Sequence, residues 1–172
     1  GKGTVTGVTD AGATGLTINT TGAVTALGTV TTALATDVTI NANDAISAGT
    51  VAAAAATTVS IAGDSLATVD LSTKSTAAVT LSGSAGFKDV TTGTFKSFTN
   101  SSTGASTLGA DTTTAGLGTS ATYAGGAGAD KVTFGAQTKA QTLGAGNDTA
   151  YLTGSALGTG GSIDAGAGTD TL

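Results

Sequence analysis

The residues of this chain best suited to chemistry are aspartates that follow closely spaced glycines. Residues 125–134 read GGAGADKVTF, so Asp130 comes shortly after Gly128. The arrangement returns in LGAGNDTAY, which contains Asp148, and again in AGAGTDTL, which contains Asp170. Carboxylates and backbone carbonyls are the oxygen ligands that hard cations prefer. The pattern therefore indicates a metal centre built from oxygen atoms.

The composition supports few alternatives to this oxygen chemistry. Only 10% of the 172 residues are charged, all eleven acids are Asp, all six bases are Lys, and His, Cys, Arg and Glu are missing. Without His or Cys there is no Ser-His-Asp triad, no thiol nucleophile and no ordinary zinc site. The net charge of -5 argues against a nucleic-acid partner. We therefore expect a protein that is not an enzyme. A polysaccharide lyase on a β-helix usually needs Arg, Lys and carboxylates clustered in one groove, and Arg, His and Glu are missing here.

Residues 125–133 match the nonapeptide G-G-x-G-x-D-x-U-x at every specified position, with Val132 as the apolar residue U. The second copy has Leu143 at the first glycine position and Ala150 at U, and the third has Ala165 at the first glycine position. Calcium takes six to eight oxygen ligands, so one motif supplies only part of a coordination shell. The sequence predicts calcium as the cofactor. The candidate ligands are Gly126, Gly128, Asp130, Gly144, Gly146, Asn147, Asp148, Gly166, Gly168 and Asp170.

The spacing of the motifs predicts where these ligands meet. The step from Asp130 to Asp148 equals two nonapeptides, which make one coil, so Asp148 should lie directly above Asp130 with calcium between the coils. The step from Asp148 to Asp170 is four longer, and we interpret the surplus as a wider turn within residues 153–162. Lys139 falls where the opposite side of the coil would need an Asp, so that side should hold no calcium. Asp111 is a weak candidate for a lower half-site.

The other aspartates lack this glycine context. We interpret Asp164 as a turn former rather than a ligand. The same interpretation applies to Asp10, Asp37, Asp44, Asp64 and Asp70, which we expect at coil corners.

The rest of the chain contains the elements that must position these motifs. Short apolar-polar-apolar runs recur at nearly equal steps, and their central residues are Ile18, Ile40, Ile61 and Leu81. A second series lies about half a period away and consists of Val30, Val51, Leu71 and Val90. Alternation is typical of β-strands, and a shared period is typical of stacked coils. Each series therefore predicts one column of apolar side chains.

The predicted fold class is all-β: a parallel β-solenoid, or β-roll, with coils of about 20 residues. Eight or nine coils would account for the whole chain. We expect a Thr/Ala-rich solenoid over residues 1–120 and calcium-binding coils over residues 121–172 that continue the same solenoid. A β-sandwich fits the strand lengths but does not require the steady period, and the Gly and β-branched residues disfavour helices. Disorder is disfavoured because the apolar residues, 39% of the chain, are regularly patterned.

No apolar run approaches the roughly 20 residues needed to span a bilayer, so we expect no membrane span. The missing Met leads us to expect a piece of a longer polypeptide. Zero cysteine suits an exported protein stabilised by metal as well as an intracellular one. The compartment therefore has to be inferred from the motifs.

The glycine-aspartate motifs resemble those of the RTX family of secreted calcium-binding repeat proteins. Residues 124–172, including the TKA between the first two motifs, look like a segment of the surface-layer (S-layer) proteins of Caulobacter type. The resemblance implies a bacterial exoprotein that leaves by type I secretion, folds on meeting calcium and tiles the cell surface with further copies of itself. It also implies that the glycines and Asp130, Asp148 and Asp170 bind calcium, whereas Leu143 and Ala165 depart from the pattern.

The expected function is therefore a structural one, in an S-layer lattice at the bacterial cell surface. Contact with cell-surface polysaccharide would involve parts of the parent chain beyond this sequence. The alternative is an adhesin stalk or an ice-binding solenoid. TINTT, TVTTA and DTTTA could stack into threonine ladders, although they recur irregularly along the sequence.

Overall fold

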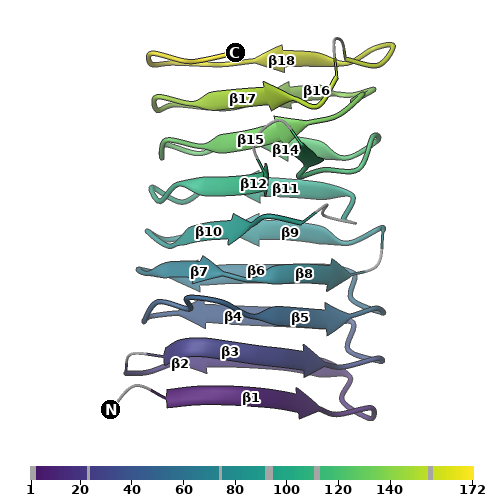
Figure 1. Ribbon diagram of the computed structural model, residues 1–172, viewed down its shortest axis with the longest axis vertical. Helices are drawn as coiled ribbons and strands as arrows, with labels where there is room; N and C mark the ends of the chain where they lie inside the picture. Colours follow the sequence, from purple (N-terminus) through teal and green to yellow (C-terminus); the bar gives the residue numbers. More distant parts are fainter. Residues whose placement is uncertain (1–2, 23, 74, 92–94, 111–112, 155–156) are drawn as a thin grey trace.

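A computed structural model describes residues 3–22, 24–73, 75–91, 95–110, 113–154 and 157–172. In these ranges the chain forms strands joined by turns and no helix, and it winds into coils stacked along one axis (Figure 1). The expected all-β parallel solenoid is confirmed. Within the described residues, no helix is long and apolar enough to cross a membrane.

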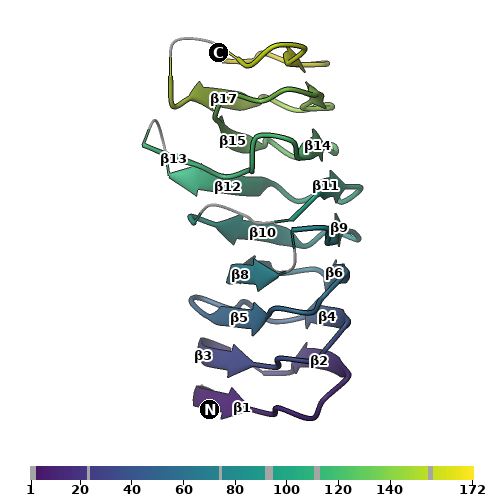
Figure 2. The same cartoon turned by 90° about the vertical axis from the view of Figure 1, so that its right-hand side faces the viewer.

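One wall of the solenoid is an eight-stranded parallel sheet that runs the length of the molecule, which we call the long sheet (Figure 2). Its strands are β2 (Gly15–Thr20), β4 (Asp37–Ala42), β6 (Thr58–Gly63), β9 (Ala78–Leu81), β11 (Ser97–Asn100), β14 (Thr122–Ala124), β16 (Ala140–Thr142) and β18 (Ser162–Asp164). The eight strands correspond to about seven turns, fewer than the eight or nine expected for the whole chain, and β1 lies before the first of these strands. The sheet continues across residue 120, from β11 to β14, and so joins the two predicted regions.

The opposite side is built from two shorter sheets. The N-terminal sheet contains β1 (Gly3–Thr9), β3 (Val24–Thr31), β5 (Thr50–Ala53) and β8 (Asp70–Thr73). The C-terminal sheet contains β7 (Leu66–Thr68), β10 (Gly86–Asp89), β12 (Ser106–Ala110), β15 (Lys131–Phe134) and β17 (Thr149–Leu152). The short β13 (Thr114–Ala115) pairs antiparallel with β12 and projects from the stack (Figure 2). One coil, which holds β6, β7 and β8, contributes to all three sheets.

The first predicted column is confirmed by the register of the long sheet. Ile18 pairs with Ile40, Ile40 with Ile61, and Ile61 with Leu81. The last three are fully buried, whereas Ile18 is half-buried near the N-terminal end of the long sheet. Each coil therefore buries its apolar face only with the help of its neighbours.

The second predicted column is confirmed for three residues and wrong for the fourth. Val30, Val51 and Leu71 are paired in register and buried. Val90 is 40% exposed. After Leu71 the next coil pairs with β7 rather than with β8, so the N-terminal sheet ends and Val90 has no column to join among the described strands. Asp89 approaches Leu71 instead, and its Oδ2 accepts a hydrogen bond from the Leu71 amide at 3.0 Å.

The core becomes aromatic toward the glycine-aspartate motifs. Phe98 stacks on Phe87 with ring centroids 5.6 Å apart and on Tyr123 at 5.7 Å, and Tyr123 meets the edge of Phe134. All four side chains are buried. These large rings fix the distance between the two walls where the glycine-aspartate turns begin.

Candidate metal centre

The three glycine-aspartate motifs form stacked turns that connect the long sheet to the C-terminal sheet. Lys131 pairs with Thr149, and Thr149 forms a bridge with Thr171, so the preceding aspartates lie one above another.

The surplus length before the third motif is found where the sequence predicted it. Phe134 pairs with Leu152, whereas Ala140 pairs with Ser162 across a longer stretch of chain. The four extra residues therefore lie between Leu152 and Ser162, in agreement with the interpretation of residues 153–162. Residues 155–156 of that turn lie outside the described residues.

Glycine is required in these turns for two different reasons. In the upper turns the backbone has positive φ, 97° at Gly144 and 135° at Gly146, which side chains rarely tolerate. Gly166 and Gly168 have positive φ as well. In the lowest turn the reason is close approach: a Cβ on Gly126 would lie 2.6 Å from the carbonyl oxygen of Ser102.

The same close approach recurs in each glycine column. A Cβ on Gly128 would lie 2.5 Å from the carbonyl oxygen of Gly104, and one on Gly146 would lie 2.5 Å from that of Gly128. Stacked backbone carbonyls therefore pack directly against the glycines of the next coil.

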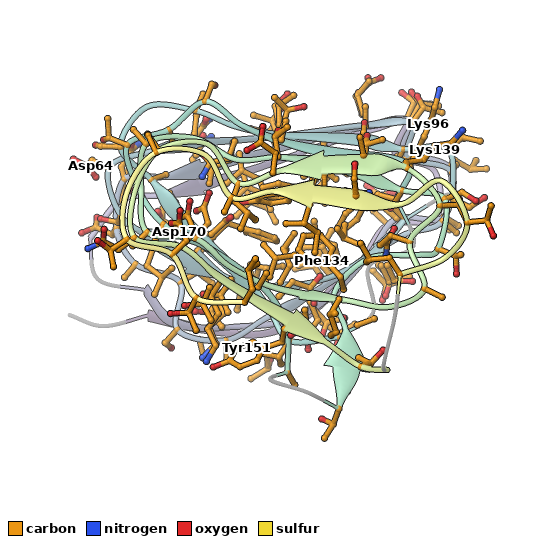
Figure 3. All side chains as sticks on the ribbon, turned by 90° about the horizontal axis from the view of Figure 1, so that it is seen from above. Asp64, Lys96, Phe134, Lys139, Tyr151 and Asp170 are labelled. Carbon is orange, nitrogen blue, oxygen red and sulfur yellow. The ribbon has the colours of Figure 1, made fainter. Side chains whose placement is uncertain are left out.

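The aspartates form what we call the aspartate ladder: Asp130, Asp148 and Asp170, one per coil. Asp170 Oδ1 accepts a hydrogen bond from the Asp148 amide at 2.9 Å, and Asp148 Oδ1 accepts one from the Asp130 amide at 2.7 Å. Asp130 and Asp148 are each 1% exposed, and Asp170 is half-buried at the open end and points inward (Figure 3). Each carboxylate of the upper two thus ties its coil to the one below through a charge-assisted hydrogen bond.

At the bottom of the ladder the Asp130 carboxylate is surrounded by donors. Its Oδ1 accepts hydrogen bonds from the Ser106 amide at 2.6 Å, the Ser106 hydroxyl at 3.0 Å and Asn100 Nδ2 at 3.2 Å. The Gly126 amide is 3.4 Å from Oδ2. The Ser106 hydroxyl also lies 2.5 Å from the Tyr123 hydroxyl. Burial, and next the nearby Asp130 charge, raise the pKa of Tyr123, so it remains a neutral phenol beside the carboxylate.

The Asp148 carboxylate has fewer hydrogen-bond donors around it than that of Asp130. Its Oδ2 is buried and has no hydrogen-bond partner among the described residues. Burial raises the pKa of Asp148, and the charges of Asp130 and Asp170 raise it further against the opposing effect of the hydrogen bond from the Asp130 amide. An unpaired carboxylate oxygen between two like charges is costly to bury. A cation placed there would remove that cost.

The remaining predicted residues have distinct environments. Asn147 is exposed, and its Oδ1 accepts a hydrogen bond from the Thr169 amide at 2.9 Å, which links two coils. Asp164 Oδ1 accepts one from the Gly166 amide at 3.1 Å, as expected of a turn former. Lys139 lies at the far corner of the coil, away from the ladder (Figure 3). Asp111 lies outside the described residues.

Four residues around the ladder were not singled out in the sequence. Asn100, Ser106 and Tyr123 surround Asp130, and Gln141 accepts a hydrogen bond from the Tyr123 amide at 2.6 Å. Ser106 occupies the ladder position of the coil below, because Thr107 pairs with Lys131.

The position of Ser106 could not be read from the motifs. Only the similarity of LGAD to GGAGAD hinted at a lower coil, and it pointed to Asp111 instead. The register, which skips the residues of β13, identifies Ser106.

The described residues contain no cluster of three or more His, Cys, Asp or Glu side chains that could hold a metal. Any ion here would therefore need backbone carbonyls as well as the aspartates. Comparison with known protein families finds no match, and no curated protein is significantly similar to the chain. The case for a metal centre thus depends on the geometry of the ladder.

Proposed function

We propose that this chain is a structural segment of a bacterial surface layer, a secreted β-solenoid whose C-terminal coils are held together by calcium. The observation that carries the proposal is the buried Oδ2 of Asp148, which has no partner among the described residues and lies in the middle of the aspartate ladder. Of the three ladder residues, Asp148 is the one with a carboxylate of the same motif both above and below. Calcium would neutralise this stack and join successive coils, so its binding free energy would add to the folding free energy.

The donor set fits calcium better than other biological metals. Asp130, Asp148 and Asp170 offer carboxylate oxygens, and the glycine turns bring backbone carbonyls close to the next coil. Hard oxygen ligands in a flexible number suit calcium, whereas zinc and copper favour nitrogen or sulfur ligands. Because donors already surround Asp130, we assign the upper part of the ladder, Asp148 and Asp170, the larger share of binding.

Calcium titration by calorimetry, with hydrogen exchange to locate the ordering, tests the metal. We expect Asp148→Ala to lose most of the binding and Asp170→Ala to lose part of it. Lys139→Ala is the matched control, since it changes a charge far from the ladder, and it should bind as wild type. Protection on adding calcium should increase in residues 124–172 and much less in residues 3–91. Wild-type stoichiometry and affinity in Asp148→Ala would refute the site.

Assembly with further copies is supported by the ends of the stack. The outer edges of β18 and β2 have no neighbouring strand in the long sheet among the described residues, and free edges template association. A cavity of about 410 Å³ opens at the C-terminal end. Leu172 is 79% exposed there. We assign this end to contact with another copy of the chain. The cavity lining is mostly apolar and consists of Ala150, Tyr151, Leu152, Leu157, Ile163 and Leu172.

Electron microscopy with and without calcium tests the assembly. A periodic sheet that forms with calcium and is lost in Leu172→Asp supports the surface-layer assignment. Isolated rods would favour the adhesin stalk instead, and a strict monomer at high concentration with ample calcium would count against both.

One observation favours the ice-binding alternative. Five successive strands of the long sheet each place one hydroxyl residue at the same register position, so that each pairs with the next. These residues are Thr17, Thr39, Ser60, Thr80 and Thr99. Four of them are exposed and Thr39 is half-buried, so they form a row of hydroxyls at one per coil. Ice-recrystallisation inhibition that is abolished by Thr80→Tyr would support this second function. No inhibition by the wild type would dismiss it.

A further inference from the structure

The turn below the lowest glycine-aspartate motif is a fourth copy of the same turn, without the aspartate. The pairing of β12 with β15 places residues 101–106, SSTGAS, beneath residues 125–130, GGAGAD. Gly104 is kept at the third glycine position, and Ser106 stands where the motif above has Asp130. This lowest turn is therefore closed without a carboxylate of its own at the ladder position.

The side chain of Asn100, which is 3% exposed, closes this turn. Its Oδ1 accepts a hydrogen bond from the Ser102 amide at 2.8 Å, which fixes the orientation of the side-chain amide and turns Nδ2 toward the ladder. Nδ2 lies 3.2 Å from the Gly104 carbonyl oxygen and 3.2 and 3.4 Å from the two carboxylate oxygens of Asp130. Three oxygen atoms from two successive coils thus converge on one nitrogen atom.

Carboxylate and carbonyl oxygens that converge on one point are the usual surroundings of a hard cation. Here the neutral amide of Asn100 occupies that point with its two N–H donors. The Ser106 hydroxyl donates to Asp130 Oδ1 at 3.0 Å, and because its single hydrogen is used there, the Tyr123 hydroxyl donates to Ser106 at 2.5 Å. Protein groups therefore satisfy Asp130 from below, whereas Asp148 Oδ2 has no partner among the described residues.

We propose that Asn100 takes the place of a calcium ion at the base of the aspartate ladder, so that residues 101–106 form a metal-free turn above which calcium binding begins. The inference rests on the proposed calcium role of the ladder. It makes Asn100 the residue that determines how many ions the ladder holds, because the gap below Asp130 is closed without metal. The coils above Asp130 then assemble on a preformed turn when calcium is supplied.

The test is calcium titration by calorimetry and amide hydrogen exchange on the full chain with Asn100→Asp. This nearly isosteric change keeps the acceptor for the Ser102 amide and replaces Nδ2 by an oxygen that faces Asp130. We expect the variant to bind one more calcium ion than wild type. In chelator its Ser106 amide should exchange about tenfold faster or more, because two buried carboxylates then face each other, and calcium should restore the wild-type rate. The matched control is Asn19→Asp, an exposed side chain far from the ladder, which should behave as wild type.

A second measurement needs no variant: in wild type, calcium should slow the exchange of the Asp148 amide and leave that of the Ser106 amide unchanged. An equal response of both amides would overturn the inference. So would Asn100→Asp that binds no additional ion, or that stays unfolded with calcium, since Asn100 would then be only a structural amide. Absence of calcium binding in wild type would instead remove the proposed function. Calcium binding gained by Asn100→Asp alone would still support the role of Asn100.

Discussion

In the absence of calcium, Asp148→Asn should be more stable than wild type. In the presence of calcium, it should be less stable than wild type. The change is nearly isosteric. Oδ1 can still accept the hydrogen bond from the Asp130 amide, now 2.7 Å long, and the amide group replaces the unpartnered Oδ2. In the absence of metal, the variant removes a buried charge that faces Asp130 and Asp170.

The size of the effect follows from the environment of Asp148. A buried polar acceptor without a partner costs about 1–3 kcal/mol. Asp148 Oδ1 keeps one hydrogen bond, from the Asp130 amide, which offsets part of this cost, so we expect about 1–2 kcal/mol at neutral pH. For a chain of this length that corresponds to an increase in Tm of roughly 2–8 °C. The gain should vanish at a pH low enough for Asp148 to be protonated in wild type.

Calcium should reverse the order of stability of wild type and Asp148→Asn. Wild type gains about 2.7 kcal/mol at a calcium concentration of about 100 times Kd, and Asp148→Asn should gain far less. Thermal melts with chelator and with calcium measure both effects. Asp164→Asn is the control, because Asp164 is exposed and its hydrogen bond to the Gly166 amide can be kept by Asn. A calcium-free Asp148→Asn that is less stable than wild type, or a calcium shift equal to that of wild type, would refute the reasoning.

Three further predictions rest on stability measurements of the same kind. Burial raises the folded-state pKa of Asp148 and Asp89 above the unfolded value of about 3.9. The calcium-free free energy of unfolding should therefore decrease as pH increases from about 4 through the folded pKa values. A free energy of unfolding that does not change over this pH range would contradict the prediction. Gly146→Ala should lower the free energy of unfolding by more than about 2 kcal/mol, because φ is 135° and the Cβ would press on the Gly128 carbonyl. Gly154→Ala is the control, since a Cβ there meets open space and should be neutral. Equal effects of the two variants would be contrary evidence. Ile40→Ala should lower the free energy of unfolding by about 2–5 kcal/mol, and Ile18→Ala clearly less, because Ile18 is only half-buried. Urea melts of both variants measure the two losses. A larger loss in Ile18→Ala would argue against the buried column.

The sequence alone determined the repeating part of this protein. Ile18, Ile40, Ile61 and Leu81 recur at nearly constant steps, and in a stack of coils a constant step places residues directly above one another. The nonapeptide spacing likewise put Asp148 above Asp130. The extra four residues before Asp170 could be assigned to one turn because the flanking motifs kept their own spacing. Local alternation and period suffice wherever each coil copies its neighbour.

Only the tertiary structure decided the places where the coils differ. Val90 continues the spacing of its series, but the change from the N-terminal to the C-terminal sheet removes its partner strand and brings Asp89 to Leu71. Ser106 lies beneath Asp130 because the β13 excursion lengthens its coil, and a serine has no signature that sequence could reveal. Lys88 and Lys131 are far apart in the sequence and come to lie in one row, on either side of Thr107, only through strand pairing. Irregular coils set their register by packing against the aromatic core, and that packing is not encoded in any local pattern.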